Sequence, residues 1–348
     1  MTMELKVAGE KDTEEWDKLV ENSAHGTIFH TWKWLKIAEK HTNSKLYPII
    51  GYKGTKPVGI YPLFWIRKKG VKLVFSPPPK TLLLYLGPTF SDFQKLKQSM
   101  KESLFMEFQT EVDNFITSKL KGNYIRIRTS PGLLDSRPLR WAGYHVEPLY
   151  TYVMGLTKGT DNIWNGFNKE LRRNINKAQK EDIKVEEGSK EEIYIINELL
   201  RQRFEEQGYR SSKDYYRSYL SDVYEAFYPQ NLRIFVAKYS GEIITGQIAV
   251  CYSDKISLWA GSPKTNILRG TPNDLLQWEI IKWACKHGFR QYEIMDAGDD
   301  PRLRHFKAKF NPELAVWFSA VKYSSPIFKG LERTARFVYN KLGLGRLI

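Results

Sequence analysis

A cluster of basic and aromatic residues near the C-terminal end of the chain has the composition of an anion site. Nine consecutive positions hold four Lys or Arg residues, a histidine and two phenylalanines: Arg302, Arg304, His305, Phe306, Lys307, Lys309 and Phe310. If the phenylalanines anchor one face of this segment, Lys307 points elsewhere, and in a cleft it can stabilise an oxyanion or a phosphate. The alternative is a surface loop held by the two rings.

A second set of cations lies on a helix predicted over residues 161–181, with Asp161 as its N-cap. The apolar residues recur every three or four positions and so form one buried face: Trp164, Phe167, Leu171, Ile175 and Ala178. Opposite this face lie Arg173, Lys177, Lys180 and Lys184, with Arg172 at the boundary between the faces. Arginine binds phosphate well, so this face suits a phosphate-bearing partner. The alternative is an ordinary solvated face.

A strand over 256–261, a glycine-bearing loop and a helix over 272–287 form a third candidate anion site. Thr271 would cap this helix, with Pro272 at its first position and Asp274 completing a capping box. Trp259 on the strand and Asn273 at the helix start are candidate substrate-binding residues. Residues 291–298 then read as a strand that ends in an acidic turn.

These elements belong to a mixed α/β chain that carries one structural pattern twice. Residues 47–64 and 233–250 each read as strand, turn glycine and second strand, and a helix-rich stretch precedes each copy (13–43 and 161–222). Neither half has the regular alternation of a doubly wound parallel sheet. We therefore expect largely antiparallel sheets in two domains, 1–155 and 156–325, followed by a basic amphipathic helix over 326–348.

The composition narrows the class of function. Lys and Arg number 54 against 39 Asp and Glu, and this net charge of +15 favours a polyanionic partner. Two cysteines form no disulfide framework, the acids at 296, 299 and 300 fit no standard metal loop, and no secretory signal or membrane span is visible. We expect a cytoplasmic protein without a metal. Gly-x-Ser-x-Gly, HExxH and CxxC motifs are absent.

Four segments, in this order, resemble the Fem-like branch of the GNAT acyltransferase superfamily. They are Phe29–Lys36, Leu171–Ala178, Thr271–Trp278 and Phe306–Phe310. The resemblance spans roughly residues 25–322 and implies two tandem GNAT-like domains, in agreement with the repeated hairpins. It implies an enzyme that transfers an aminoacyl group from aminoacyl-tRNA, or an acyl group from acyl-CoA, to an amine on a phosphorylated or lipid-linked precursor of the cell envelope.

The resemblance also assigns roles to residues. It implies that Lys36 and Arg172 or Arg173 hold acceptor phosphates, while Phe306 and Lys307 serve the donor and Lys307 steadies the transition state. Trp34, in the first matching segment, and Arg304, near the last, are further substrate-binding candidates, and Asp296 is the candidate general base. The usual basic residue followed by Gly-x-Gly or Gly-x-Ala of coenzyme A sites is missing, and no cofactor is expected to be bound permanently.

Three alternatives to this interpretation remain open. The chain could be a GNAT acetyltransferase that uses acyl-CoA, a GNAT-like scaffold that has lost catalysis, or an RNA-binding module with no catalysis, which only the charge and the interleaved aromatics support. The apolar stripe over 328–342 beside Lys329, Arg333 and Arg336 would let the last helix contact an anionic membrane surface. Docking of the same stripe onto the body of the protein explains it equally well. The central expectation is that two sister modules meet at a seam whose cations hold the substrate.

Overall fold

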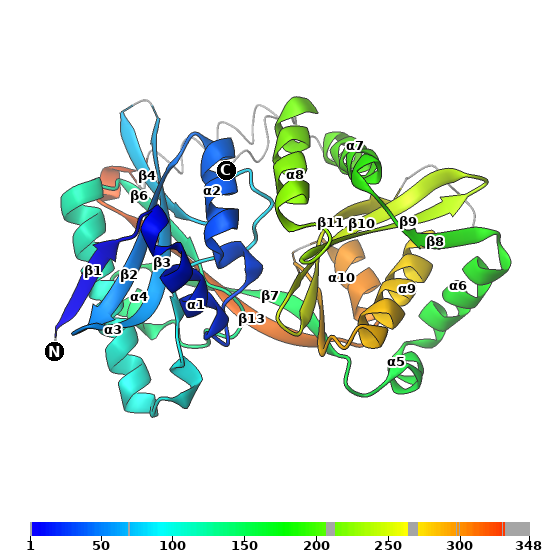
Figure 1. The fold of residues 1–348 in the computed structure, drawn as a ribbon, viewed down its shortest axis with the longest axis horizontal. Coiled ribbons are helices and arrows are strands. Elements are labelled where there is room, and N and C mark those ends of the chain that lie inside the picture. Colours follow the sequence, from blue (N-terminus) through cyan, green and yellow to red (C-terminus); the bar gives the residue numbers. More distant parts are fainter. Residues whose placement is uncertain are drawn as a thin grey trace. The chain divides into compact units, whose positions relative to one another are not determined.

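The computed structural model divides the chain into two compact units (Figure 1). It describes residues 2–328 and 330, apart from 69, 207–212, 264–270, 297 and 299. Unit 1 comprises Met1–Leu149 and the described chain from Val316, and unit 2 comprises Tyr150–Ala315. The expected domains were 1–155 and 156–325. The difference at the C-terminal end has a physical cause, because Ser319–Tyr323 pair with a strand of unit 1.

Unit 1 is built on a sheet with the strand order β1-β2-β3-β4-β6-β13. The strands are β1 (Met3–Val7), β2 (Lys45–Lys53), β3 (Lys56–Lys68), β4 (Val71–Ser76), β6 (Tyr124–Arg128) and β13 (Glu313–Tyr323), with β5 (Thr89–Phe90) beside β3. The helices are α1 (Thr13–Glu21), α2 (Trp32–Thr42), α3 (Gln98–Phe115) and α4 (Arg137–Trp141), with short turns η1 (Glu10–Asp12), η2 (Ile28–His30), η3 (Phe93–Lys95) and η4 (Ile116–Leu120). β4 and β6 pair in parallel, whereas the other pairings that involve β2, β3 or β13 are antiparallel.

Unit 2 repeats this plan on a sheet with the order β7-β12-β11-β10-β9-β8. The strands are β7 (His145–Gly155), β8 (Ile183–Glu187), β9 (Leu232–Tyr239), β10 (Glu242–Tyr252), β11 (Lys255–Pro263) and β12 (Gln291–Ile294). The helices are α5 (Thr160–Gly166), α6 (Lys169–Lys180), α7 (Lys190–Glu206), α8 (Lys213–Phe227), α9 (Pro272–Lys286) and α10 (Pro301–Ala308). Here too one strand pair is parallel, β11 with β12, and the others are antiparallel.

The predicted mixed α/β fold with two antiparallel hairpins is confirmed. The first hairpin is β2–β3 and turns at Gly54, and the second is β9–β10 and turns at Gly241. Both glycines have a positive φ, 62° and 81°, a conformation that costs glycine nothing. In each unit a helix then connects the parallel pair, α3 between β4 and β6, and α9 between β11 and β12. No helix among the described residues is both long and apolar enough to cross a bilayer.

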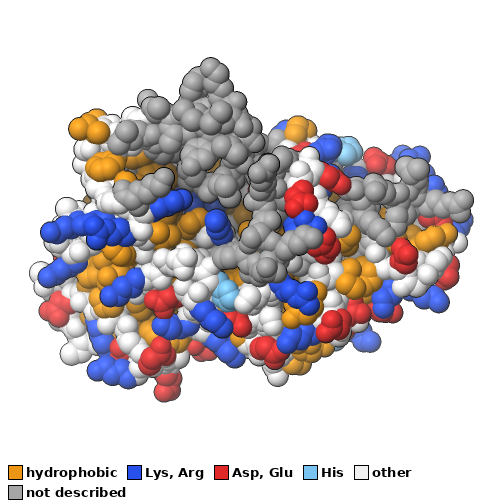
Figure 2. Space-filling view, turned by 90° about the horizontal axis from the view of Figure 1, so that it is seen from above, with side chains coloured by type: hydrophobic (Ala, Val, Ile, Leu, Met, Phe, Trp, Pro, Cys, Tyr) orange, Lys and Arg blue, Asp and Glu red, His pale blue; other side chains and the backbone are white. Residues whose placement is uncertain are grey.

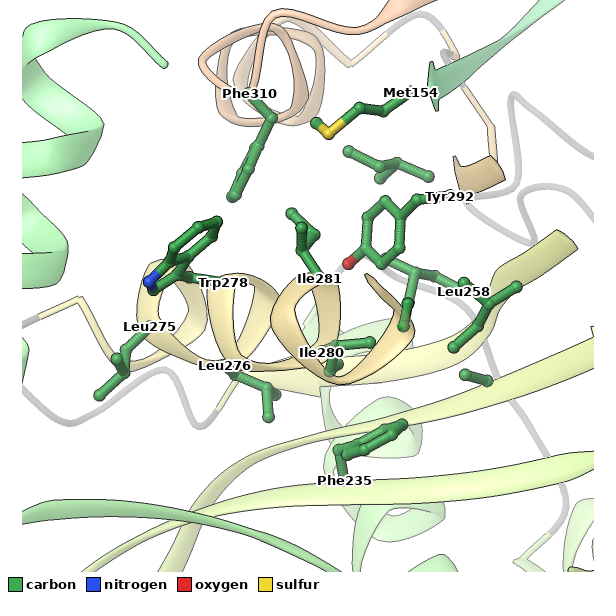
Figure 3. Close-up of a cluster of buried hydrophobic side chains, with 14 of the residues drawn as sticks. Met154, Phe235, Leu258, Leu275, Leu276, Trp278, Ile280, Ile281, Tyr292 and Phe310 are labelled. Carbon is green, nitrogen blue, oxygen red and sulfur yellow. The ribbon is translucent and has the colours of Figure 1, made fainter. Parts of the chain in front are cut away.

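The core of unit 2 lies between its sheet and α9 (Figure 3). Leu276 and Ile280 of α9 are fully buried and point toward the strand that carries Phe235. Trp278, on the same helix, packs against Phe167 with 5.4 Å between ring centroids, and Phe167 is also 5.4 Å from Phe310. α7 and α8 cover the opposite face of the sheet (Figure 1). The segment that carries Phe310 is therefore tied to the same core as α9.

Candidate functional site

The two parallel strands of unit 2 separate after three paired residues. Their register ends at Ser257 of β11 and Glu293 of β12, and β11 runs on to Pro263 while β12 ends at Ile294. A register shift places one extra residue, Trp259, on β11 between the partners of Ile248 and Ala249 of β10, which is a β-bulge. The end of the pairing and the bulge together mark the place where β11 and β12 no longer share backbone hydrogen bonds. We call this place, beyond Ser257 and Glu293, the notch.

Lys307 binds the backbone of the chain that leaves the notch. Its Nζ donates hydrogen bonds to the backbone carbonyls of Met295 and Asp296, the two residues that follow β12. These carbonyls lie beyond the end of the β11–β12 register, so the ammonium takes the place of a strand partner. Lys307 is only 8% exposed, and this burial lowers its pKa while the nearby Asp296 carboxylate opposes the shift. An ammonium has three donors, and two of them are used here.

Asp296, the predicted base, does not lie on a strand. It follows β12 with a left-handed φ of 63°, its side chain is exposed, and Oδ1 accepts a hydrogen bond from the backbone N of Gly298 at 2.8 Å. The strand is shorter than predicted, since β12 has four residues, and the acidic turn stays a prediction because residues 297 and 299 lie outside the described residues. Asp296 and Lys307 lie together at one end of the notch. The role of Asp296 as a base remains a prediction.

The predicted helix over 161–181 is two helices, α5 and α6. The chain turns at Phe167, and the side chain of Asn168 caps α6 by accepting a hydrogen bond from the backbone N of Leu171 at 2.7 Å. Asparagine at this position starts a helix more readily than it continues one, which explains the break. The buried residues of α6 are the predicted Leu171, Ile175 and Ala178. Lys184 lies outside the helix, on β8.

The outer face of α6 borders an open hollow of about 700 Å³, which we call the basic hollow. It is lined by Trp164 of α5 and by residues of α6: Lys169, Arg172, Arg173, Asn176, Lys177 and Lys180. Among the described residues, only Lys177 of these cations has an acidic partner, Glu181 at 3.9 Å. The Nε of Arg172 is buried and has no hydrogen-bond partner among the described residues. Four of the five cations of the hollow thus form no ion pair with a described residue.

The basic hollow has cations on one surface without interspersed acids among its described lining residues. On the face of the molecule that Figure 2 shows, by contrast, Lys and Arg are interspersed with Asp and Glu. Elsewhere in the described chain, Lys and Arg side chains commonly form ion pairs, as Lys190 does with Glu225. Unpaired cations that line one concave surface attract a multiply charged anion. The basic hollow is therefore the described surface that suits phosphate best.

Most of the segment 302–310 is helical rather than the expected loop, since α10 extends to Ala308. Asp300 caps α10 through Oδ1, which accepts from the backbone N of Arg302 at 2.8 Å, and Pro301 occupies the first helical position. An aspartate followed by proline is a common helix start, and this signal was present in the sequence. Phe306 packs on the buried Phe310, with 5.6 Å between centroids, so the two rings do anchor the segment as predicted.

A buried ion pair at the end of α10 was not predicted from the sequence. The Nζ of Lys309 lies 3.1 Å from Oδ2 of Asp274 at the start of α9, and the residues are only 8% and 1% exposed. The same carboxylate accepts from Nδ2 of Asn174 of α6 at 2.9 Å. Asp274 therefore does not complete a capping box, and Thr271 makes no side-chain cap bond. The sequence signal that could have indicated a buried Lys309 was its spacing of two residues from Lys307.

Two of the other predicted substrate-binding residues are core residues. Trp34 is fully buried and packs edge-on against Phe29, with 4.9 Å between centroids, so it has no surface to offer a substrate in this conformation. Trp259 is 7% exposed and packs on Tyr219 of α8. Trp34 was chosen for its place in a motif and Trp259 for its place on a strand, and buried aromatic residues commonly serve packing. Both have packing roles in this structure, and contact with a substrate stays a prediction.

The remaining candidates lie at the surface or near it. Lys36, in unit 1, is partly exposed and pairs with Glu39 at 2.6 Å and Glu10 at 3.6 Å; the hydrogen bond with Glu39 raises its pKa. A phosphate at Lys36 would have to compete with these two carboxylates. In unit 2, Asn273 accepts a hydrogen bond from Thr245 at 3.4 Å, and Arg304 is exposed on α10.

At the corresponding place in unit 1, another segment of the chain pairs with the end of β6. β4 and β6 pair in parallel up to Ser76 and Ile127, and then Leu86 forms a parallel bridge with Thr129. The backbone N of Leu86 donates to the carbonyl of Arg128 at 2.8 Å, and Tyr85 and Leu86 are buried. Of the two parallel strand pairs, only that of unit 2 lacks such a segment in the described part of the chain.

The comparisons with known proteins agree with this plan. Residues 165–307, from α5 to α10 of unit 2, match the family described as the acetyltransferase (GNAT) domain. No curated protein matches the sequence. The structure of FemX superposes with a TM-score of 0.68 at 15% identity and covers 91% of this chain and 96% of FemX.

Two further solved structures share the fold over nearly the whole chain. One is a tandem GNAT protein from the clavulanic acid biosynthesis pathway, with a TM-score of 0.57, 10% identity, and coverage of 93% of this chain and 99% of that one. The other is the C-terminal domain of a putative lysylphosphatidylglycerol synthetase from Agrobacterium fabrum, with a TM-score of 0.55, 13% identity, and coverage of 93% and 96%.

The family match assigns a GNAT acetyltransferase domain to residues 165–307 of unit 2, and this domain makes the protein an acyltransferase. The fold of the whole chain is that of FemX and of tandem GNAT proteins, which confirms the tandem GNAT-like fold that the resemblance to the Fem-like branch implies.

Proposed function

We propose that this protein forms an amide by transferring an acyl or aminoacyl group from an activated ester or thioester to an amine on a phosphorylated or lipid-linked precursor of the cell envelope. The observation that carries the proposal is the presence, within one GNAT unit, of a buried lysine ammonium at the notch, that of Lys307, and of a hollow on α6 whose cations are mostly without an acidic partner among the described residues. The acyl group to be transferred would bind at the notch, and the phosphates of the substrate would bind in the basic hollow.

The chemistry requires few groups from the protein. The amine attacks the carbonyl carbon, a tetrahedral oxyanion forms, and its collapse releases the alcohol or thiol, which takes up a proton as the amine loses one. The third donor of the Lys307 ammonium is available for the oxyanion, and Asp296 beside it is the candidate to accept the proton. One oxyanion donor commonly contributes a factor of about 10² to 10³ in rate.

Phosphate binding in this proposal falls to the basic hollow. Arg172 and Arg173 have no acidic partner among the described residues, and the buried Nε of Arg172 has a donor to offer. Arginine can bind a phosphate with two parallel hydrogen bonds, which fixes orientation as well as affinity. Lys36 of unit 1 remains a further candidate for acceptor phosphates, in competition with Glu10 and Glu39.

Two donors fit the site and differ in their anionic part. Aminoacyl-tRNA would present a chain of phosphates, whereas acyl-CoA would present a few. The name of the lysylphosphatidylglycerol synthetase domain favours an aminoacyl group, as does the resemblance to the Fem-like branch, whereas the GNAT acetyltransferase domain favours an acyl group from acyl-CoA. The lipid product in the name of the synthetase agrees with a lipid-linked acceptor and with peripheral contact to an anionic membrane.

The non-catalytic RNA-binding alternative is favoured by a specific observation as well. α6 has 12 residues and is about 18 Å long, so its cations extend over three turns, further than a single pyrophosphate needs. A catalytic protein and a binding module would both retain RNA on this face, and only the first would consume a charged donor.

The deciding experiment supplies the purified protein with a labelled aminoacyl-tRNA or a labelled acyl-CoA, together with phosphorylated amine acceptors, and follows the label into an amide. We expect one donor to be consumed, and the rate to fall when Arg172 and Arg173 are both changed to Gln. The double variant Lys190→Met, Glu225→Gln, an ion pair on the far helices of the same unit, serves as control. Tight RNA binding with no consumption of either donor would establish the binding module instead.

A further inference from the structure

The direction in which the cations of the basic hollow point depends on the rotation of α6 about its own axis. The buried stripe of α6 consists of Leu171, Ile175 and Ala178, which pack in the core that also contains α9. Apolar contacts are not directional, whereas hydrogen bonds and ion pairs are, so polar contacts add a constraint on this rotation.

Polar contacts from one lysine reach α6 at three points. The backbone carbonyl of Lys309 accepts from the N of Asn168, the N-cap, at 3.1 Å. The ammonium of Lys309 lies 3.8 Å from Oε1 of Glu170, and through Asp274 it reaches Asn174. These three points cover about a turn and a half of the helix, and Glu170 and Asn174 lie on its flank, between the buried stripe and the cations of the hollow.

The free energy of burying the Lys309–Asp274 ion pair helps to identify its role. Both groups are almost fully buried, and the cost of removing two charges from water commonly offsets their attraction. Replacement of such a pair by apolar residues is often neutral for stability, so stability alone does not explain it. The pair does fix direction, because Asp274 binds Lys309 and Asn174 at the same time.

We infer that Lys309 and Asp274 form a positioning pair that sets the rotation of α6 and thereby aims Arg172 and Arg173 into the basic hollow. The same five-residue segment, Phe306–Phe310, holds the notch through Lys307 and the hollow through Lys309. The inference rests on the proposed function, in which the hollow binds phosphate.

The test is a calorimetric titration of the full chain with inorganic tripolyphosphate at low ionic strength. The double variant Asp274→Leu, Lys309→Met replaces the pair by apolar side chains of similar size. We expect its thermal unfolding midpoint to stay near that of the wild type, and its affinity for tripolyphosphate to fall about tenfold, the equivalent of one misaligned charge-assisted contact. The double variant Lys190→Met, Glu225→Gln should bind as the wild type does.

Asn174→Leu gives the same test if the double variant does not fold. This change removes only the hydrogen bond that joins Asn174 of α6 to Asp274 of the pair. Lower affinity of this stable variant supports the inference. Wild-type affinity in either stable variant overturns it and leaves the phosphate site intact. If the wild type binds no tripolyphosphate, or binds it equally after Arg172→Gln with Arg173→Gln, the phosphate site of the proposed function fails and the positioning role fails with it.

Discussion

Lys307 of α10 donates a hydrogen bond from its ammonium to the backbone carbonyl of Met295, the first residue after β12. This contact lies beyond the last paired residues of β11 and β12, where the Met295 carbonyl has the lysine as a hydrogen-bond partner. The buried ammonium of Lys307 has a structural role, and the third of its three hydrogen-bond donors stays available. Substitution of Lys307 separates these two tasks, because stability reports on the first and the rate of transfer on the second.

Lys307→Met should reduce the rate of acyl transfer about 100-fold, because it removes one oxyanion donor. Initial rates at saturating donor and acceptor measure this effect. Because the variant also leaves the carbonyls of Met295 and Asp296 without their donor, its thermal unfolding midpoint should fall as well. A rate like that of the wild type would exclude Lys307 from the chemistry.

Protein stability should fall as the pH falls below about 6.5, because of two buried histidines in unit 1. Burial lowers the pKa of His25 to about 3 and that of His30 to about 4, from 6.5. Each ring is neutral in the fold and gains a proton on unfolding. Since the unfolded chain then binds more protons, each histidine costs about 1.4 kcal/mol per pH unit between pH 6.5 and its folded pKa.

Thermal unfolding from pH 7.5 to 5 measures this slope. His30→Gln should keep part of the hydrogen bonding with Thr27 and the Leu86 carbonyl, and its slope should be shallower than that of the wild type. Equal slopes for the two proteins would show that His30 takes up no proton on unfolding in this range.

Gly261→Ala should destabilise unit 2 by about 1–3 kcal/mol through overpacking. A methyl group at this position would lie 2.6 Å from the backbone O of Gly246 on the neighbouring strand, so β10 or β11 would have to shift. Urea unfolding of the variant gives the change in free energy. Gly155→Ala is the matched control, since a methyl group there meets nothing within 4 Å, and a similar loss in both variants would contradict the packing argument.

Lys322→Met should weaken the attachment of β13 to unit 1. The ammonium of Lys322 lies 3.1 Å from Oδ2 of Asp113, and Oδ1 of the same carboxylate accepts a hydrogen bond from the hydroxyl of Tyr144 at 2.7 Å. The lysine is partly exposed, so we expect a loss of about 1 kcal/mol. Urea unfolding compares it with Lys119→Met, an exposed lysine of the same unit, and equal stability of the two variants would contradict the prediction.

The sequence was informative where periodic or capped segments set the structure. The helix that starts at Pro272 and the two glycine-turn hairpins were predicted because their patterns are local. The break at Phe167 and the helix after Asp300 were missed, although Asn168 and Asp300 carry ordinary capping signals. In both cases a conspicuous charge pattern outweighed a weaker local one.

The candidate site was predictable only in part. Arg172 and Arg173 were found because an amphipathic helix shows its outer face in the sequence. The Lys309–Asp274 pair joins residues 35 positions apart, and nothing local marks such a pair. Trp34 and Trp259 were assigned to substrate from their places in a motif and on a strand, which carry no information about burial. The stripe over 328–342, apart from residues 328 and 330, lies outside the described residues, and its membrane role stays a prediction.

The central claim is that unit 2 divides the work between the notch and the basic hollow, and steady-state kinetics of amide formation test it most directly. We predict that Arg172→Gln with Arg173→Gln raises the KM of the phosphate-bearing substrate at least about tenfold with little change in kcat, whereas Lys307→Met lowers kcat with little change in that KM. Equal effects of the two changes on both constants, or no effect of either, would contradict it.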